Sequence, residues 1–323
     1  MDILSGNNNI NFLKIFLSLI VMARHLLPFI ANGQPESYVY FLMYGLSKLS
    51  VPLFLIITGY YIGKKADDFK YILGRVKKIL IIFIVWQVVS FYFAYQTYKE
   101  GLLTKTNFYL DIFYGFGHLW YLSALILSLF LIYFTNKFSN RTKLIVAISL
   151  LIISYFLQYN NHLRFVENKL LNNFYIYCGT NRNFLFYAFP YLLLGTIYDY
   201  WKKYLSINLY FGYTFFLMLL IFELSIYYHF KSPAFNLFVS AFPLTLFIFN
   251  HIINLKNQIK FSFPKTLSIG IYLIHPAVLY FFYTKSNIMN SYSYTYLFVL
   301  LLFLTILFWY FLDKINKKIK IFF

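Results

Sequence analysis

The chain has 323 residues, of which 61% are hydrophobic and 12% are charged, and its formal net charge is +18. A mean hydropathy of +0.65 excludes an ordinary water-soluble domain. The positive charge does not indicate a nucleic-acid-binding protein, because the basic residues lie between apolar stretches and form no basic patch in a soluble module. We therefore expect an integral membrane protein.

The first apolar stretch, residues 10–30, contains Lys14, Arg24 and His25 in a segment otherwise suited to lipid. Ionisable groups at membrane depth are costly and often mark a functional site. In a helix, the spacing of Lys14 and His25 puts them within roughly 20° of one face and about 16 Å apart along the axis. The cation could hold phosphates, and the imidazole could take a proton from a hydroxyl. Alternatively, Lys14 and Arg24 only extend to opposite interfaces and His25 is a packing residue.

Apolar runs near the roughly twenty residues that cross a bilayer predict about ten transmembrane helices. They lie near 10–30, 38–62, 79–98, 118–135, 144–159, 184–200, 205–228, 235–254, 266–284 and 294–312. With the N-terminus inside, 18 Lys and Arg residues fall in inner loops and the C-terminal tail, and 7 fall in outer loops. Short cytoplasmic loops are enriched in these residues, so both termini are expected in the cytoplasm.

The predicted fold class is therefore all-α, a polytopic membrane protein of the plasma (inner) membrane. No linker rich in Gly, Ser or Pro interrupts the helices, and no soluble segment of domain size follows them. We expect residues 1–323 to form a single transmembrane domain with no appended soluble domain.

The sequence does not favour metal or nucleotide-hydrolysing chemistry. Cys178 is the single cysteine, which excludes an internal disulfide and a thiolate metal cluster. No HExxH string occurs, and no carboxylate lies at metal-ligand spacing from a histidine, so no metal is expected. A GxSxG elbow and a Walker loop are also absent.

Two further histidines fall in predicted helices. His118 opens the helix at 118–135 on its outer side, and His275 lies near the middle of the helix at 266–284. Pro276, which follows it, removes a backbone donor from that helix. With His25, three helices would bring histidines to the outer half of the membrane. The alternative is a structural role for His118 and His275, and an ordinary role is expected for the remaining histidines, His162, His229 and His251.

Other charged residues suggest binding roles. Arg75 and Lys78 share one face where the third predicted helix begins, and such a pair can bind a phosphate. Membrane topology and anionic lipid are the alternative explanation of that pair. Lys48 and Glu223 lie deep in the second and seventh predicted helices, where they could form a mutual ion pair.

Five segments, in order from the first predicted helix to the ninth, resemble the membrane acyltransferase-3 family, whose members acylate sugars and other acceptors at the cell envelope. They are the Lys-x10-His spacing of Lys14 and His25, Ser-Val-Pro-Leu-Phe-Leu-Ile-Ile-Thr-Gly-Tyr from Ser50 to Tyr60, the pair Arg75 and Lys78, His-Leu-Trp-Tyr-Leu from His118, and Tyr-Leu-Ile-His-Pro from Tyr272. Three departures are visible. Lys78 stands where the family more often has Arg, Thr58 replaces a serine, and the extracellular hydrolase-like domain of some members is absent.

The resemblance implies that an acyl-CoA donor such as acetyl-CoA reaches the protein from the cytoplasm, and that an acceptor hydroxyl approaches from the outer side. Lys14, Arg75 and Lys78 would bind the donor, and His25 would act as general base or acyl relay. The residues expected to bind the acceptor or support the site are Arg24, Lys48, His118, Trp120, Tyr121, Glu223, Tyr272 and His275. Acyl-CoA is then a substrate, and no permanently bound cofactor is expected. The implied partners are a glycan or lipid-linked sugar acceptor and membrane lipids, and the transfer finishes either in this domain or with a separate envelope protein.

Two other functions compete with this one. A carrier or flippase for a lipid-linked glycan would use a cationic lining to hold the head group, and Lys48 and Glu223 are its strongest support. It differs from an acyltransferase in that it need not consume acyl-CoA. A structural or signalling membrane protein leaves the five ordered segments without an explanation.

Overall fold

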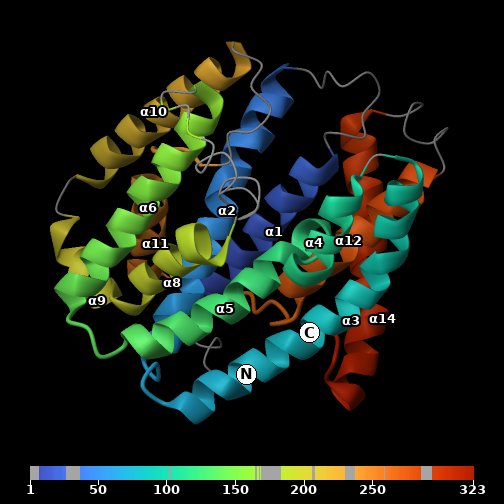
Figure 1. Ribbon diagram of the computed structural model, residues 1–323, viewed down its shortest axis with the longest axis horizontal. Coiled ribbons are helices and arrows are strands. Elements are labelled where there is room, and N and C mark those ends of the chain that lie inside the picture. The colour runs from blue at the N-terminus through green and yellow to red at the C-terminus, as the bar shows by residue number, and fades with distance from the viewer. Residues whose placement is uncertain are drawn as a thin grey trace. The chain divides into compact units, whose positions relative to one another are not determined.

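Helices make up the regular structure of the computed structural model, which describes residues 7–26, 37–101, 103–163, 166, 168, 183–205, 208–229, 237–257, 259–284 and 293–323 (Figure 1). Within these ranges there is no strand. Cys178 lies outside the described residues, as do the side chains of His162 and His229. The all-helical prediction is confirmed for the described part of the chain.

Seven helices of the described ranges are long and apolar enough to cross a membrane. They are α1 (Asn8–Leu26), α2 (Ser37–Gly63), α3 (Phe69–Lys99), α5 (Trp120–Thr135) with the turn η4 (Gly117–Leu119), α6 (Asn140–Leu163), α10 (Leu209–His229) and α14 (Tyr294–Ile319). Three shorter apolar helices accompany them: η5 (Phe184–Ala188) continuing into α8 (Phe189–Thr196), α11 (Ala241–Asn254) and α12 (Leu267–Thr284). Together they follow the ten predicted runs in order. The number of crossings and the side on which the termini lie stay predictions.

Several helices differ from their predicted extent, and two of the differences bear on the site or on the packing. α3 begins at Phe69, ten residues before the predicted run, so the basic segment that contains Arg75 and Lys78 is helical. The predicted run at 184–200 is divided, because α8 ends at Thr196 and Ile197 leaves the helical conformation before the short α9 (Tyr198–Trp201). Apolarity alone did not show where that helix stops.

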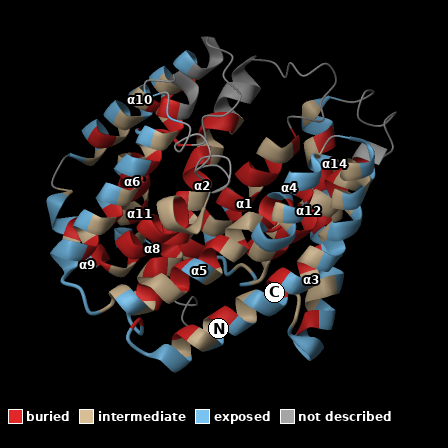
Figure 2. Cartoon of the chain, viewed as in Figure 1, coloured by how far each residue is buried: buried red, intermediate tan, exposed pale blue. Residues whose placement is uncertain are grey.

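Exposed apolar side chains cover the outer faces of several helices. In Figure 2 exposed segments alternate with half-buried ones along α10. Tyr210 and Phe211 of α10 are 83% and 65% exposed, and Phe303 of α14 is 62% exposed. A soluble protein would bury such residues. Their exposure is typical of lipid-facing surfaces, which agrees with a multi-pass membrane protein.

The chain forms two compact units, which are described separately. Unit 1 comprises residues 1–50, 77–122 and 256–323, and unit 2 comprises residues 51–76 and 123–255. α2, α3 and α5 each contribute to both units. The single transmembrane domain stays a prediction.

In unit 1, α1 and α12 pack side by side and run in the same direction (Figure 1). The Asn9 side chain bonds with the backbone of Asn257 and Ile259 at the start of α1, and the Ser18 hydroxyl donates to the Ser268 carbonyl 2.9 Å away near mid-helix. Two parallel transmembrane helices require an odd number of crossings between them. The seven predicted crossings between α1 and α12 meet this requirement.

α14 runs antiparallel to α1 and α12. At its start Tyr294 donates to the Ala23 carbonyl near the end of α1, and near its end Asp313 accepts from Thr266, next to the start of α12. Gly270 permits a close approach between α12 and α14, since a Cβ there would stand 2.2 Å from Trp309 Cδ1. The start of α1 and the end of α14 therefore lie at the same end of unit 1.

The turn that carries His118 is held by Gln87 of α3. The Gln87 amide donates to the carbonyls of Asp111 and Ile112 in α4 (Lys105–Tyr114) and accepts from the Phe116 amide. Gly115 and Gly117 adopt positive φ angles of 103° and 56°, which other residues rarely adopt. The chain can therefore turn sharply from α4 into η4.

Unit 2 is built on a close contact between α2 and α8. A Cβ on Gly59 would stand 2.0 Å from the Leu192 carbonyl oxygen, and one on Gly63 would stand 2.8 Å from Thr196 Cα. Small residues four apart let the backbones of membrane helices approach closely. Gly59 thus has a packing role in the segment from Ser50 to Tyr60.

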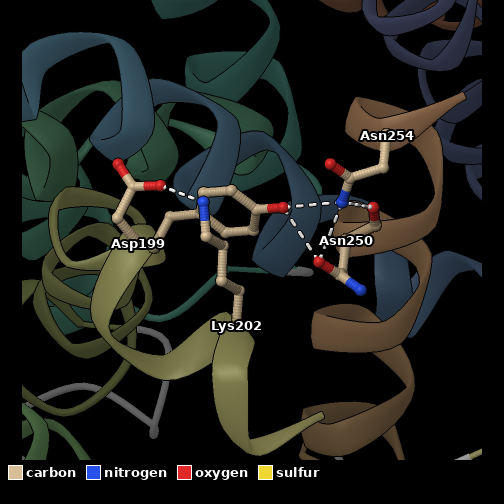
Figure 3. A network of polar contacts seen from close by, with 5 residues as sticks. Asp199, Lys202, Asn250 and Asn254 are labelled. Atoms are coloured by element: carbon tan, nitrogen blue, oxygen red, sulfur yellow. Dashed lines mark hydrogen bonds and ion pairs between the residues drawn. The ribbon is translucent and has the colours of Figure 1, made fainter. Parts of the chain in front are cut away.

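Polar residues tie the other helices of unit 2 together. Tyr198 of α9 donates to Asn250 of α11 and accepts from Asn254, while Lys202 pairs with Asp199 beside them (Figure 3). These bonds join the short α9 to α11 and fix the turn that follows α8.

The α2–α8 contact gives a stability prediction. We expect Gly59→Ala to destabilise the protein by about 1–3 kcal/mol, because the added methyl group has to push the α8 backbone away. Thermal unfolding of the full chain in detergent measures the change. Gly74→Ala is the control, since a Cβ at that helical position meets nothing within 4 Å. Equal melting temperatures for the two variants would contradict the packing role of Gly59.

Candidate functional site

α1 directs its polar residues and its large aromatic residues to opposite sides. Phe12 and Phe16 are 45% and 48% exposed, whereas Ser18 contacts α12 and His25 bonds to it. Lys14 lies on the polar side, about 40° around the axis from Ser18. Because α1 is continuous from Asn8 to Leu26, Lys14 and His25 share one face as the spacing predicts.

His25 and His275 form a direct pair. The Nδ1 atom of His25 lies 2.7 Å from Nε2 of His275, and the two rings are 5.0 Å apart between centroids. His275 is completely buried, and its own Nδ1 lies 2.7 Å from the Ile271 carbonyl oxygen one turn back in α12. Both histidines were expected in the outer half of the membrane, but the bond between them was not predicted.

The carbonyl of Ile271 fixes the tautomers of a neutral pair. A carbonyl oxygen only accepts, so Nδ1 of His275 must carry the proton, and Nε2 of His275 is then an acceptor. Nδ1 of His25 therefore donates to it, and Nε2 of His25 is the unprotonated nitrogen. The result is an imidazole with a basic nitrogen, oriented by a second imidazole.

Pro276 contributes to this arrangement. It has no amide hydrogen, so the Tyr272 carbonyl lacks its usual partner four residues on, although α12 continues through the proline. The imidazole of His275 bonds to the carbonyl of Ile271, which directly precedes Tyr272 in the chain. The His275 ring is thus attached to its own helix beside the backbone position that Pro276 leaves without a donor.

His118 joins the pair from η4. Its ring centroid is 5.8 Å from that of His275 and 5.1 Å from that of Tyr272, and the Tyr272 hydroxyl donates to its carbonyl. The His118 side chain is buried, and its Nε2 has no hydrogen-bond partner among the described residues. Tyr121 stacks edge to face on Tyr272. The three predicted histidines therefore meet in unit 1.

Two cations gather beside this histidine cluster. The Arg24 guanidinium carbon lies 4.8 Å, and the Lys48 ammonium nitrogen 4.2 Å, from the ring centroid of Tyr44. Lys48 is buried with 7% of its surface exposed, and Tyr44 with 2%. Tyr44 was not predicted as a site residue. Its only sequence signal was the four-residue spacing to Lys48, which puts two residues on one helix face.

Glu223 has a local role that the sequence did not reveal. Its two carboxylate oxygens accept from the backbone amides of Val239 and Ser240, each at 2.9 Å, and from the Ser240 hydroxyl, all at the start of α11. A carboxylate is stabilising at a helix N-terminus. Glu223 is half-buried rather than deeply buried. Lys48 and Glu223 belong to different units, and their mutual ion pair stays a prediction.

The other predicted residues have simpler surroundings. Arg75 and Lys78 are half-buried on α3, and Arg75 lies over the ring of Tyr71. Trp120 contacts Tyr121, its neighbour in the chain. Among the described residues, no three His, Cys, Asp or Glu side chains, the histidine cluster included, are arranged so that they could hold a metal ion, and the absence of a metal stays a prediction.

Comparison with known proteins identifies the family. The model of the acyltransferase domain family Acyl_transf_3 matches residues 7–314, nearly the whole chain. The chain belongs to the acyltransferase-3 family. The resemblance drawn from the five segments is thereby confirmed, and the apolar helices agree with a multi-pass membrane protein of this family.

The chain is also similar, at low identity, to a curated protein. The chain is 27% identical over 292 residues to a protein of Enterococcus faecalis named amino-acid racemase. That match covers 84% of this chain and 41% of the relative, so the chain spans less than half of that protein's length. No solved structure matches the chain.

Proposed function

We propose that this acyltransferase-3 protein is an O-acyltransferase that moves an acyl group, most simply acetyl, from cytoplasmic acyl-CoA to a hydroxyl of an envelope glycan or related acceptor. The observation that carries the proposal is the His25–His275 bond, which leaves His25 with a basic Nε2 nitrogen in a neutral pair. Family membership supplies the reaction class. The donor, the acceptor and the role of each residue are part of the proposal.

In the proposed reaction, Nε2 of His25 takes the proton of the acceptor hydroxyl. The hydroxyl oxygen attacks the thioester carbonyl carbon, a C–O bond forms, and the C–S bond breaks. The leaving CoA thiolate then takes the proton from His25. General-base assistance of this kind contributes typically 10²–10⁴-fold. Because a thioester is already activated, direct transfer needs no acyl-enzyme, and an acyl relay through His25 remains the second route.

The remaining cluster has supporting roles. The buried Nε2 of His118 can donate a hydrogen bond to the acyl carbonyl oxygen, where negative charge develops during attack. Lys14 is half-buried on the face of α1 that carries His25, about 16 Å from His25 along the helix axis, and it binds the phosphates of the donor. An extended pantetheine arm covers a distance of this order. Phosphate binding by Arg75 and Lys78 is proposed separately for α3.

We place the protein in the plasma (inner) membrane with both termini in the cytoplasm, on the charge asymmetry of the loops. Acyl-CoA acts as a substrate, and no resident cofactor or metal is proposed. A separate envelope protein that receives or completes the transfer fits the same scheme.

The direct test compares envelope glycans by mass spectrometry from cells with and without the protein. A lost ester would identify both the acyl group and the acceptor. The purified full chain in nanodiscs should then consume acyl-CoA only when that acceptor is present. A glycan carrier or flippase would leave the acyl-CoA intact, and acceptor transport without its consumption would reject the proposal. The helix-capping role of Glu223 removes part of the sequence support for the carrier.

Donor binding gives a separate prediction. We expect Lys14→Ala to raise the KM for acyl-CoA about tenfold to hundredfold with a small change in kcat, because a charge-assisted hydrogen bond contributes roughly 1.5–3 kcal/mol. Initial rates at varied acyl-CoA concentration measure both constants. Arg75→Ala, measured in the same way, tests the phosphate role of α3. An unchanged KM in either variant would leave that residue with a topological role only.

A further inference from the structure

The cationic cluster of Arg24, Lys48 and Tyr44 is built from two helices of unit 1. Tyr44 and Lys48 lie one turn apart on α2, so the ammonium group rests over the ring of its own helix neighbour. Arg24 reaches the same ring from α1. The cluster is largely buried, and it brings two positive charges to one aromatic side chain.

The cluster adjoins the histidine pair. Arg24 directly precedes His25 in the chain. Tyr294 of α14 donates to the carbonyl of Ala23, the residue before Arg24. Arg24 is about 100° around α1 from His25. The imidazole of His25 and the guanidinium of Arg24 therefore lie on neighbouring sides of α1, at the same end of the helix.

Few carboxylates of unit 1 fall in its described residues. They are Glu100, Asp111 and Asp313, and Asp313 is bonded to Thr266 and Lys317 at the opposite end of α14 from Tyr294. Arg24 makes no ion pair with a described residue. Lys48 is buried and Arg24 is half-buried, and charges in a low-dielectric setting attract an anion more strongly than the same charges in water. The chemistry of the cluster therefore favours an anionic ligand.

We propose that Arg24 and Lys48 form an anion-binding subsite that receives an acidic group of the acyl acceptor, a phosphate or a carboxylate, and so holds the acceptor hydroxyl at His25. This inference rests on the proposed acyl transfer and adds the substrate class. The donor phosphates are assigned to Lys14 in the proposed reaction, and Lys14 lies ten residues, or about 15 Å, from Arg24 along α1. A guanidinium holds either acid through two parallel hydrogen bonds, and the ammonium adds a point charge.

The first test uses the acceptor that mass spectrometry identifies by its lost ester. We expect that component to carry a phosphate or a carboxylate near the acylated hydroxyl. An acceptor without an acidic group would overturn the subsite and leave acyl transfer intact. If no ester is lost when the protein is removed, the proposed function itself fails, and the subsite with it.

The second test determines whether Arg24 and Lys48 bind the acidic group of the acceptor. With the full chain in phosphatidylcholine nanodiscs, we expect Arg24→Gln and Lys48→Gln each to raise the KM for the extracted acceptor at least tenfold and leave the KM for acyl-CoA unchanged. A correctly inserted Arg24→Lys protein keeps the positive charge and should retain part of the activity. Lys99→Gln is the matched control, because Lys99 also lies over a tyrosine ring, Tyr95 at 4.9 Å, but is exposed. Unchanged acceptor KM values in inserted Arg24→Gln and Lys48→Gln proteins would overturn the subsite.

A membrane lipid head group offers the same phosphate, so a third measurement separates the two sources. Acyl transfer is compared in pure phosphatidylcholine and in nanodiscs that contain phosphatidylglycerol. If the acceptor supplies the anion, the rate is independent of phosphatidylglycerol. A requirement for phosphatidylglycerol that Arg24→Gln removes would assign the subsite to lipid and reject an acceptor role.

Discussion

The His25→Ala variant should insert and fold but lose acyl transfer by about 10²–10⁴-fold, the usual contribution of a general base. The loss should appear in kcat, because the imidazole acts on the reacting hydroxyl and does not hold the donor phosphates. Acyl-CoA consumption by the purified full chain with its acceptor measures the rate. Size-exclusion profiles of the variant in detergent report whether it has folded.

Phe16→Ala provides the matched control on the same helix. Phe16 is 48% exposed and lies about 180° around α1 from His25, so its truncation removes similar bulk without touching the histidine pair. We expect near-normal activity. A His25→Ala protein that transfers acyl groups at the wild-type rate would remove the general-base assignment and strengthen the carrier hypothesis.

The sequence predicted the helical class and the course of the helices because apolar runs of membrane length are strong local signals. It also predicted that His25, His118 and His275 would come from three helices to the outer half of the membrane. The bond between His25 and His275 required the parallel packing of α1 on α12, which joins residues 250 apart in the chain. No local pattern specifies such a contact.

Two residues show where sequence reasoning lacked a signal. Tyr44 is one of 33 tyrosines, and only the fold brings Arg24 to the ring that Lys48 already covers. Glu223 was interpreted from its depth in an apolar run. Its partners, the amides of Val239 and Ser240, belong to a turn that the apolar run at 235–254 concealed. In both cases the missing information was the position of a second helix.

His275 should act by orienting His25, and two substitutions can separate this role from simple packing. In His275→Gln, the side-chain oxygen can occupy the place of Nε2 and accept from Nδ1 of His25, so we expect much of the activity to remain. In His275→Asn, the shorter amide can still bond the Ile271 carbonyl but does not reach His25. We expect its kcat to fall about 10²-fold or more, with the KM for acyl-CoA unchanged, because His25 then loses the bond that fixes its tautomer.

The relative rates of the two His275 variants distinguish an orienting role from a packing role. A packing role predicts that both polar substitutions impair the protein together and lower its melting temperature in proportion to the lost activity. An orienting role predicts that His275→Gln has a higher kcat than His275→Asn, whereas their melting temperatures are similar. Only the Gln side chain places an acceptor at the position of Nε2. Equal rates for the two variants would show that His25 does not depend on His275 for its basic nitrogen. The proposed series of hydrogen bonds, from the Ile271 carbonyl through His275 and His25 to the acceptor hydroxyl, would then not be needed for catalysis.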